Sequence, residues 1–193
     1  MQFQKVKELM ISRLSNNLSD KLYYHGVHHT LDVLEVCESR AEKEALSESE
    51  HVLLCTAAIM HDAGFLNVIQ NHEQEGVSIA RTLLPDFGYS EADVETIAGM
   101  IMATKIPQQP NSKLEQIICD ADLDYLGRDD FYHIGGKLFK ELKELGVVKN
   151  EKDWDALQIK FLSGHTYHTK FSIENREPQK QEKLTELKEK WNV

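Results

Sequence analysis

An adjacent histidine and aspartate, His61 and Asp62, follow the almost wholly apolar run of residues 52–60. A helix of that composition must be buried on most of its surface. An imidazole and an ionisable carboxylate at its end are costly to bury unless they are paired, hydrogen-bonded or bound to a metal ion. Both side chains can reach one ion only from a helix end, where Gly64 would let the chain turn away. The alternative is that His61 caps the helix C-terminus and Asp62 is a solvated turn residue.

Three histidines fall within five positions, at His25, His28 and His29. Gly26 marks a turn before the helix that follows, so His28 and His29 would lie in its first turn and His25 just outside it. Because Val33 follows His29 by four positions, the two share one helix face, and we expect His29 to point inward. For His25 and His28 an exposed helix start remains the alternative.

An acidic triplet, Asp120, Asp122 and Asp124, alternates with Ala, Leu and Tyr inside an otherwise apolar run. At least one of these carboxylates must therefore face inward. On a helix, Asp122 falls on the face of Cys119 and Leu126, so we expect it to be the inward residue. Asp120 and Asp124 are expected to be solvated or to cap a helix.

These side chains need helices to position them, and apolar residues recur at helical spacing along the whole chain. The pattern Ser47 to Glu50 has the form of a capping box at the start of the helix that leads to His61. No alternating strand pattern or repeat is present, so the predicted fold class is all-α. The expected helices span residues 3–18, 28–46, 47–61, 71–84, 90–104, 112–118, 131–145, 151–162 and 178–191.

Composition describes an ordinary globular protein of 193 residues with a net charge of −10. That charge argues against an extended nucleic-acid surface or an anionic membrane as partner, but leaves room for a local pocket that binds a small anion. The three cysteines form no CxxC pair and are expected to be reduced core residues. No apolar run approaches the roughly 20 residues of a membrane span. We therefore expect a soluble, cytoplasmic protein.

The order of His29, then His61 and Asp62, then Asp122 resembles the signature of the HD-domain metal-dependent phosphohydrolase superfamily. The similarity extends to longer motifs. Residues 24–33 (YHGVHHTLDV) resemble the YHNxxHAxDV stretch of cyclic-nucleotide phosphodiesterases, residues 57–62 (AAIMHD) resemble their AAxxHD, and residues 121–123 resemble their ADL. The resemblance covers about residues 20–130. It implies one multi-helix HD-type domain over residues 1–193, with helices 131–193 packing on that core.

Residue by residue, the resemblance implies that His29, His61, Asp62 and Asp122 bind a divalent metal ion. It also implies that His25 is the acid that protonates the leaving oxygen. The chain departs from the phosphodiesterases at Gly26, where they carry Asn, and at Phe65, where they carry a further histidine. Cyclic-nucleotide specificity is therefore not implied.

Some HD enzymes bind a second metal ion through histidines between the HD pair and the last aspartate, and His72 is the only such histidine here. His72 is accordingly a candidate ligand of a second ion or a hydrogen-bonding partner of the first ion's ligands. An exposed histidine at a helix start is the alternative.

Two imidazoles and two carboxylates suit Mn²⁺, Fe²⁺, Ni²⁺, Co²⁺, Zn²⁺ or Mg²⁺. Such an ion can activate water and polarise a phosphoryl oxygen. The predicted function is hydrolysis of a phosphomonoester or phosphodiester, with a nucleotide as the favoured small substrate. The alternatives are a non-catalytic metal- or nucleotide-binding HD module and, with less support, an HD-type oxygenase.

An acidic protein that binds an anion needs a local cation. Lys105 and Arg128 are the candidates nearest in sequence to the proposed ligands, and His165, with Tyr167 and His168, could line the mouth of the site. Whether the chain forms a homodimer is left open.

Overall fold

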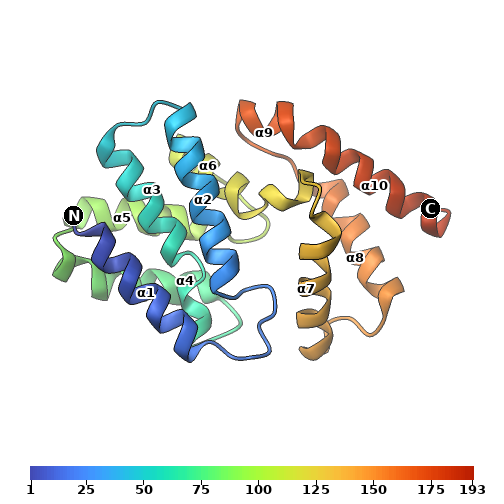
Figure 1. The fold of residues 1–193 in the computed structure, drawn as a ribbon, viewed down its shortest axis with the longest axis horizontal. Helices are drawn as coiled ribbons and strands as arrows, with labels where there is room; N and C mark the ends of the chain where they lie inside the picture. The colour runs from blue at the N-terminus through green and yellow to red at the C-terminus, as the bar shows by residue number, and fades with distance from the viewer. The chain divides into compact units, whose positions relative to one another are not determined.

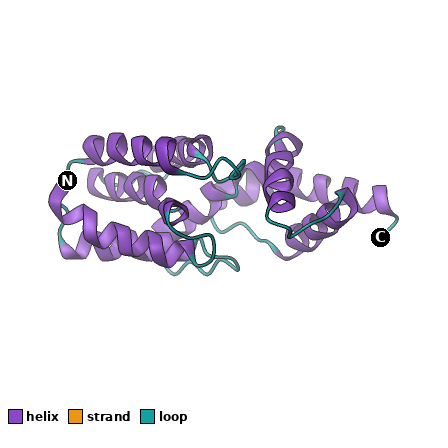
Figure 2. Cartoon of the chain, turned by 90° about the horizontal axis from the view of Figure 1, so that it is seen from below, coloured by secondary structure: helices purple, strands orange, loops and turns teal.

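The structure is a computed structural model that describes residues 1–193, and it contains helices and no strand (Figures 1 and 2). The all-α prediction is confirmed. Ten α-helices and three short 3₁₀ helices follow one another along the chain: α1 (Phe3–Asn17), α2 (Val27–Lys43), α3 (Glu48–Met60), η1 (Ala63–Leu66), α4 (His72–Leu83), η2 (Leu84–Phe87), α5 (Glu91–Ala103), α6 (Lys113–Asp122), η3 (Asp124–Gly127), α7 (Phe131–Glu144), α8 (Glu151–Gly164), α9 (Lys170–Asn175) and α10 (Glu177–Trp191).

The chain folds into two compact units. The first unit comprises Met1–Asp20 and His25–Asp122, and the second comprises Lys21–Tyr24 and Leu123–Val193. Each unit has a cluster of buried apolar side chains. The expectation of a single domain in which residues 131–193 pack on the core stays a prediction.

Helix α3 is the centre of the first unit. Every residue from Leu53 to Met60 is buried, and α3 contacts α1, α2, α5 and α6 (Figure 1). A helix that is apolar on all sides is stable only when neighbours surround it, which is the arrangement that the sequence predicts. The end of α3 therefore delivers His61 into the interior of this unit.

The start of α3 carries the predicted capping box. The hydroxyl of Ser47 accepts a hydrogen bond from the Glu50 backbone N–H at 3.3 Å, and the Glu50 carboxylate accepts one from the Ser47 backbone N–H at 2.9 Å. Ser90 and Asp93 form an equivalent capping box at the start of α5. These reciprocal bonds satisfy backbone donors that a helix start leaves without partners, so both helix starts are fixed locally.

Gly64 lies in η1, two residues after Asp62. Because it has no side chain, it allows two segments of the chain to approach each other closely. A Cβ atom at this position would overlap the backbone carbonyl of His72, at the start of α4. The sequence suggested instead that Gly64 lets the chain turn away from α3. The close approach brings the start of α4 against the end of α3, where His61 and Asp62 lie.

The second unit contains α7 to α10 and η3. Its core consists of Tyr24, Leu123, Tyr125, Leu126, Phe131, Leu162, Tyr167, Leu184 and Leu187. Helices α8 and α10 are in contact along this core (Figure 1).

The expectation that Asp120 and Asp124 are solvated is wrong, because 2% of Asp120 and 1% of Asp124 are exposed. The reason is clear for Asp124. Its Oδ1 accepts a hydrogen bond from Arg176 Nε at 2.9 Å, and its Oδ2 lies 3.8 Å from Arg128 Nη1. Two guanidinium groups thus compensate the burial of this carboxylate.

Candidate metal centre

Three side chains from different helices of the first unit meet at one point. His29 comes from the first turn of α2, His61 follows the last residue of α3, and Asp122 is the last residue of α6. One ligand atom of each lies within 4.8 Å of the others. Asp122 Oδ1 lies 3.0 Å from His29 Nε2 and 3.5 Å from His61 Nε2, and the two Nε2 atoms lie 3.4 Å apart. We call these three residues the His–His–Asp cluster.

The cluster is nearly closed to solvent. The side chains of His29 and His61 are 5% and 1% exposed, whereas that of Asp122 is 15% exposed. The prediction that His29 points inward is confirmed, and Asp122 is directed into the same cluster. Of the three side chains, that of Asp122 is therefore the most accessible to solvent.

The orientation of His61 is set by the backbone of its own helix. His61 Nδ1 lies 2.8 Å from the carbonyl oxygen of Ala58. A carbonyl oxygen only accepts, so Nδ1 carries the hydrogen and donates it. Nε2 is then the ring nitrogen that faces the cluster, and in neutral imidazole it offers a lone pair there.

Asp62 lies against both imidazoles but is not one of the three residues of the cluster. Its Oδ2 lies 3.2 Å from His61 Nε2 and 3.7 Å from His29 Nε2. This oxygen is buried and makes no hydrogen bond. A buried carboxylate oxygen without a hydrogen bond is costly, and a cation at this point would remove that cost. Together with the ligand chemistry of two imidazoles and two carboxylates, the residues present fit a divalent metal ion.

The pKa values of His61, Asp62 and Asp122 also indicate that positive charge is favourable between these side chains. Burial would lower the pKa of His61, but the carboxylates of Asp62 and Asp122 outweigh it and raise the pKa well above its usual value. Burial would raise the pKa values of both carboxyls, but the neighbouring imidazoles of His61 and His29 lower them. Both carboxylates are therefore held in the ionised form, which is the form that binds a metal ion.

Three aromatic rings lie beside the cluster. The ring of Phe65 stacks on that of His72, with centroids 3.9 Å apart and an interplanar angle of 20°, and lies 4.6 Å from the ring of His25. The His25 ring lies 6.0 Å from that of His29. His25 is also close enough for its charge to lower the pKa of Asp62. The structure thus brings His25 and His72 to the site, and it adds Phe65 as the residue between them.

His72 is tied to both α4 and Asp62. Its Nδ1 donates to the carbonyl oxygen of Ile69 at 3.3 Å, which directs Nε2 toward Asp62 Oδ1 and Glu73 Oε1, each 3.6 Å away. Glu73 is buried and was not predicted as part of the site. Its signal in the sequence is the spacing to Gly76, Val77 and Ala80, which places Glu73 on the buried face of α4.

The three candidate substrate-binding residues have different surroundings. Lys105 Nζ donates to Asn71 Oδ1 at 3.2 Å, so the ammonium lies next to the start of α4. Arg128 belongs to the second unit, where it donates to both carboxylate oxygens of Asp130. His165 also belongs to the second unit, and its backbone carbonyl accepts from the fully buried Lys180. The assignments of all candidate ligands and substrate-binding residues stay predictions.

A family model described as HD domain matches residues 26–124. This span includes the His–His–Asp cluster, Asp62 and His72. No curated protein and no solved structure matches the chain. None of the helices is both long enough and apolar enough to span a membrane.

Proposed function

The chain belongs to the HD-domain family, and from this membership we propose that it is a metal-dependent phosphohydrolase acting on a phosphomonoester or phosphodiester, with a nucleotide as the favoured substrate. The observation that carries the proposal is the buried Asp62 Oδ2, which makes no hydrogen bond and lies beside two histidine Nε2 atoms. This arrangement favours a cation between the imidazoles and the carboxylates.

The proposed ligands of a divalent ion are His29, His61, Asp62 and Asp122. When bound, a divalent ion lowers the pKa of water and neutralises charge on phosphoryl oxygens. The chain's contribution is to fix the direction of each ligand. The Ala58 carbonyl orients His61. Asp62 follows the end of α3 and Asp122 ends α6, so both carboxylates lie beside the two imidazoles. Because the site is nearly closed, these charges act with little screening by water.

His25 is the proposed general acid. Its ring lies 6.0 Å from that of His29 and packs against Phe65, so it borders the cluster without being one of the clustered side chains. A histidine at this distance can hold a proton for the leaving oxygen of a phosphate ester whose phosphoryl group lies at the cluster. An alkoxide leaves much more easily when it is protonated as the bond breaks.

Lys105 is the proposed cation for the substrate phosphate. Its position beside Asn71 places a positive charge next to His72 and the first turn of α4. The backbone N–H groups of a helix start also favour a nearby anion. Arg128 and His165 remain further candidates, and His72 remains a candidate for a second ion or for support of Asp62 through its contact with Oδ1.

The experiment that tests this function measures metal content after purification without chelator, then hydrolysis of p-nitrophenyl phosphate, bis-p-nitrophenyl phosphate and a panel of nucleotides. Each assay is run with Mn²⁺, Ni²⁺, Co²⁺ or Mg²⁺. We expect metal-dependent turnover that Asp62→Ala abolishes, while the exposed-residue control His133→Ala keeps it. Bound metal with no turnover of any ester would favour the binding module or the oxygenase, and absence of metal binding would contradict the four-ligand site.

A further inference from the structure

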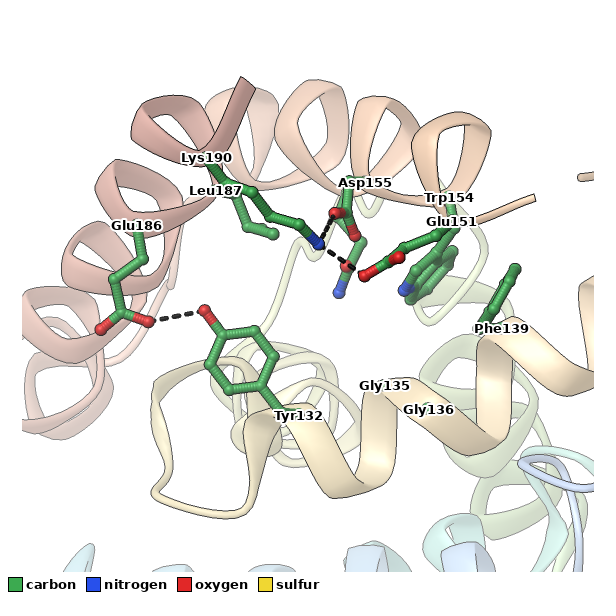
Figure 3. A pocket seen from close by; sticks show the side chains of 11 residues that line it. Tyr132, Gly135, Gly136, Phe139, Glu151, Trp154, Asp155, Glu186, Leu187 and Lys190 are labelled. Atoms are coloured by element: carbon green, nitrogen blue, oxygen red, sulfur yellow. Dashed lines mark hydrogen bonds and ion pairs between the residues drawn. The ribbon is translucent and has the colours of Figure 1, made fainter. Parts of the chain in front are cut away.

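The second unit contains a cavity of about 460 Å³ between α7, α8 and α10 (Figure 3). This volume lies in the range of pockets that bind small molecules. Three side-chain bridges surround it. Tyr132 donates to Glu186 between α7 and α10, Lys190 donates to Glu151 and Asp155 between α10 and α8, and Phe139 stacks on Trp154 between α7 and α8.

Two consecutive glycines, Gly135 and Gly136, leave the α7 side of the cavity without side chains (Figure 3). A Cβ atom at Gly136 would meet no other atom within 4 Å. Glycine inside a helix is less stable than alanine. Alanine at Gly136 would therefore stabilise α7 without a steric clash. What Gly136 provides is open space beside the backbone, whereas Gly135 lets Gln158 and Trp154 pack closely against α7.

Aromatic side chains also line the cavity, Trp154 from α8 and Phe139 and Tyr132 from α7. Trp154 is 7% exposed, and its ring lies parallel to that of Phe139, with centroids 6.0 Å apart and an interplanar angle of 18°. The ring of Tyr132 is half exposed at the other end of the cavity. Gly135 is already in contact with Trp154, since a Cβ atom there would lie 3.7 Å from the indole ring, so the open backbone is that of Gly136. A flat ligand that lies on Gly136 would contact helix backbone there and aromatic side chains at the ends of the cavity.

The side-chain amide of Gln158 also lines the cavity. Gln158 is 7% exposed. Its Nε2 would lie 3.3 Å from a Cβ atom at Gly135, so the amide faces the glycine wall. An amide offers both donors and an acceptor, so a ligand with a donor or an acceptor on its ring can hydrogen-bond to Gln158 here.

The charge around the cavity is negative. Glu151, Asp155 and Glu186 line it together with a single cation, Lys190. Lys190 is shared between Asp155 and Glu151, each at 2.6 Å, while Glu186 is paired with Lys183, which lies outside the lining. A shared ammonium leaves residual negative charge at the rim, and aromatic faces also attract cations.

We propose that this cavity binds a small planar amine, that is, an aromatic or heteroaromatic ring that carries a positive charge. The ring lies against the open backbone of Gly136, a ring N–H donates to the Gln158 side-chain oxygen, and the ammonium lies near the carboxylates of Glu151 and Asp155. This site is independent of the proposed hydrolase function, because all of its residues belong to the second unit.

The test uses three probes with one ring and different charges: tryptamine, its neutral alcohol tryptophol, and the anion indole-3-acetate. Their affinities are measured by titrating each probe into the full chain. Calorimetry reports the binding, and NMR spectra report the backbone amide signals of Gly135 and Gly136. We expect saturable tryptamine binding that shifts these signals, with indole-3-acetate weaker by about tenfold or more and tryptophol between the two. Absence of saturable tryptamine binding, or equal affinity for tryptamine and indole-3-acetate, would overturn the proposal.

Gly136→Leu provides the matched variant. The new side chain meets no atom at its Cβ and favours a helix, so the protein should fold while the cavity is filled. Tryptamine affinity should fall by about tenfold or more. The control is Gly164→Leu, at the end of α8, where a Cβ also meets nothing within 4 Å and no cavity residue is changed. A folded Gly136→Leu variant that binds tryptamine as tightly as the control would contradict the site.

Discussion

At the scale of single residues, the candidate metal centre depends on which atoms face one another. The Ala58 carbonyl takes the only hydrogen of neutral His61, and this leaves Nε2 toward His29 and Asp122. Asp62 Oδ2 lies against the same nitrogen atoms without a hydrogen bond. The facing imidazole nitrogen atoms and the carboxylate oxygen atoms are all hydrogen-bond acceptors here. Buried acceptors that face one another are stable only when a proton or a metal cation lies between them.

His25→Ala tests the proposed general acid. The proposed metal ligands are unchanged in this variant, so bound metal and the melting temperature should stay close to the wild-type values. Hydrolysis at saturating metal should fall by about a hundredfold or more, because the leaving oxygen loses its proton donor. The measurement is kcat on an alkyl phosphate ester, with His133→Ala on the exposed side of α7 as the control.

Esters of p-nitrophenol provide an internal check on that result, because their leaving group is stable without a proton. They should lose much less activity in His25→Ala than alkyl esters do. An equal loss for both kinds of ester would indicate that His25 supports the metal centre and does not donate a proton.

The sequence was sufficient to predict the inward histidine His29 and the inward carboxylate Asp122, because both follow from helical spacing against apolar neighbours. It was not sufficient for Asp124. This carboxylate is buried because Arg176, 52 residues later, reaches it, and no local pattern encodes that pairing. The ring contacts of Phe65 with His25 and His72 could not be predicted for the same reason, since they depend on how η1 meets α4 and the start of α2.

At the scale of elements, two signals define α3. The capping box fixes its start, and the apolar run fixes its burial and its end at His61. Both signals are local in the sequence, which is why this element was predicted almost to the residue. Elements that depend on distant contacts were missed, among them η1, η3 and the short helix α9.

Ser47→Ala should destabilise the protein by about 1 kcal/mol, because it removes the hydroxyl that caps α3. The measurement is urea unfolding followed by circular dichroism. Ser49→Ala is the matched control, since Ser49 lies exposed in the first turn of the same helix and does not take part in the capping box. Equal stabilities of the two variants would show that the capping box contributes little to the folded state.

Gly64→Ala should destabilise the protein much more than substitution of a glycine that has no neighbouring atoms. Its Cβ would overlap the His72 backbone, so η1 and α4 must move apart, at a cost of about 3 kcal/mol or more. Gly136→Ala should instead stabilise α7 by about 0.5–1 kcal/mol. Urea unfolding of both variants measures this contrast, and a Gly64→Ala protein as stable as the wild type would disprove the close approach.

At the scale of the whole molecule, the family match and the candidate metal centre coincide with one unit. The match covers residues 26–124, and every proposed metal ligand lies in the first unit. The second unit has its own apolar core and its own cavity. The two proposed ligand sites can therefore be tested separately in the same intact protein.

Metal binding should stabilise the first unit. At a free metal concentration about 100 times the dissociation constant, binding contributes about 2.7 kcal/mol, which corresponds to a rise in melting temperature of roughly 5–10 °C. Amide hydrogen exchange should slow most at the ends of α2, α3 and α6, where the proposed ligands lie. Asp122→Asn should abolish both effects, and a rise in melting temperature that persists in this variant would place the bound metal elsewhere.

The division of the chain has a consequence for biosynthesis and for protein engineering. Residues Lys21–Tyr24 belong to the second unit, although they lie between two segments of the first. The Tyr24 backbone N–H donates to Glu141, which is made 117 residues later, so this short segment leaves the ribosome long before its partner exists. A single cut in the gene after Asp122 would leave Lys21–Tyr24 on the wrong fragment. Two independently expressed halves would therefore need a circularly permuted or re-ligated gene.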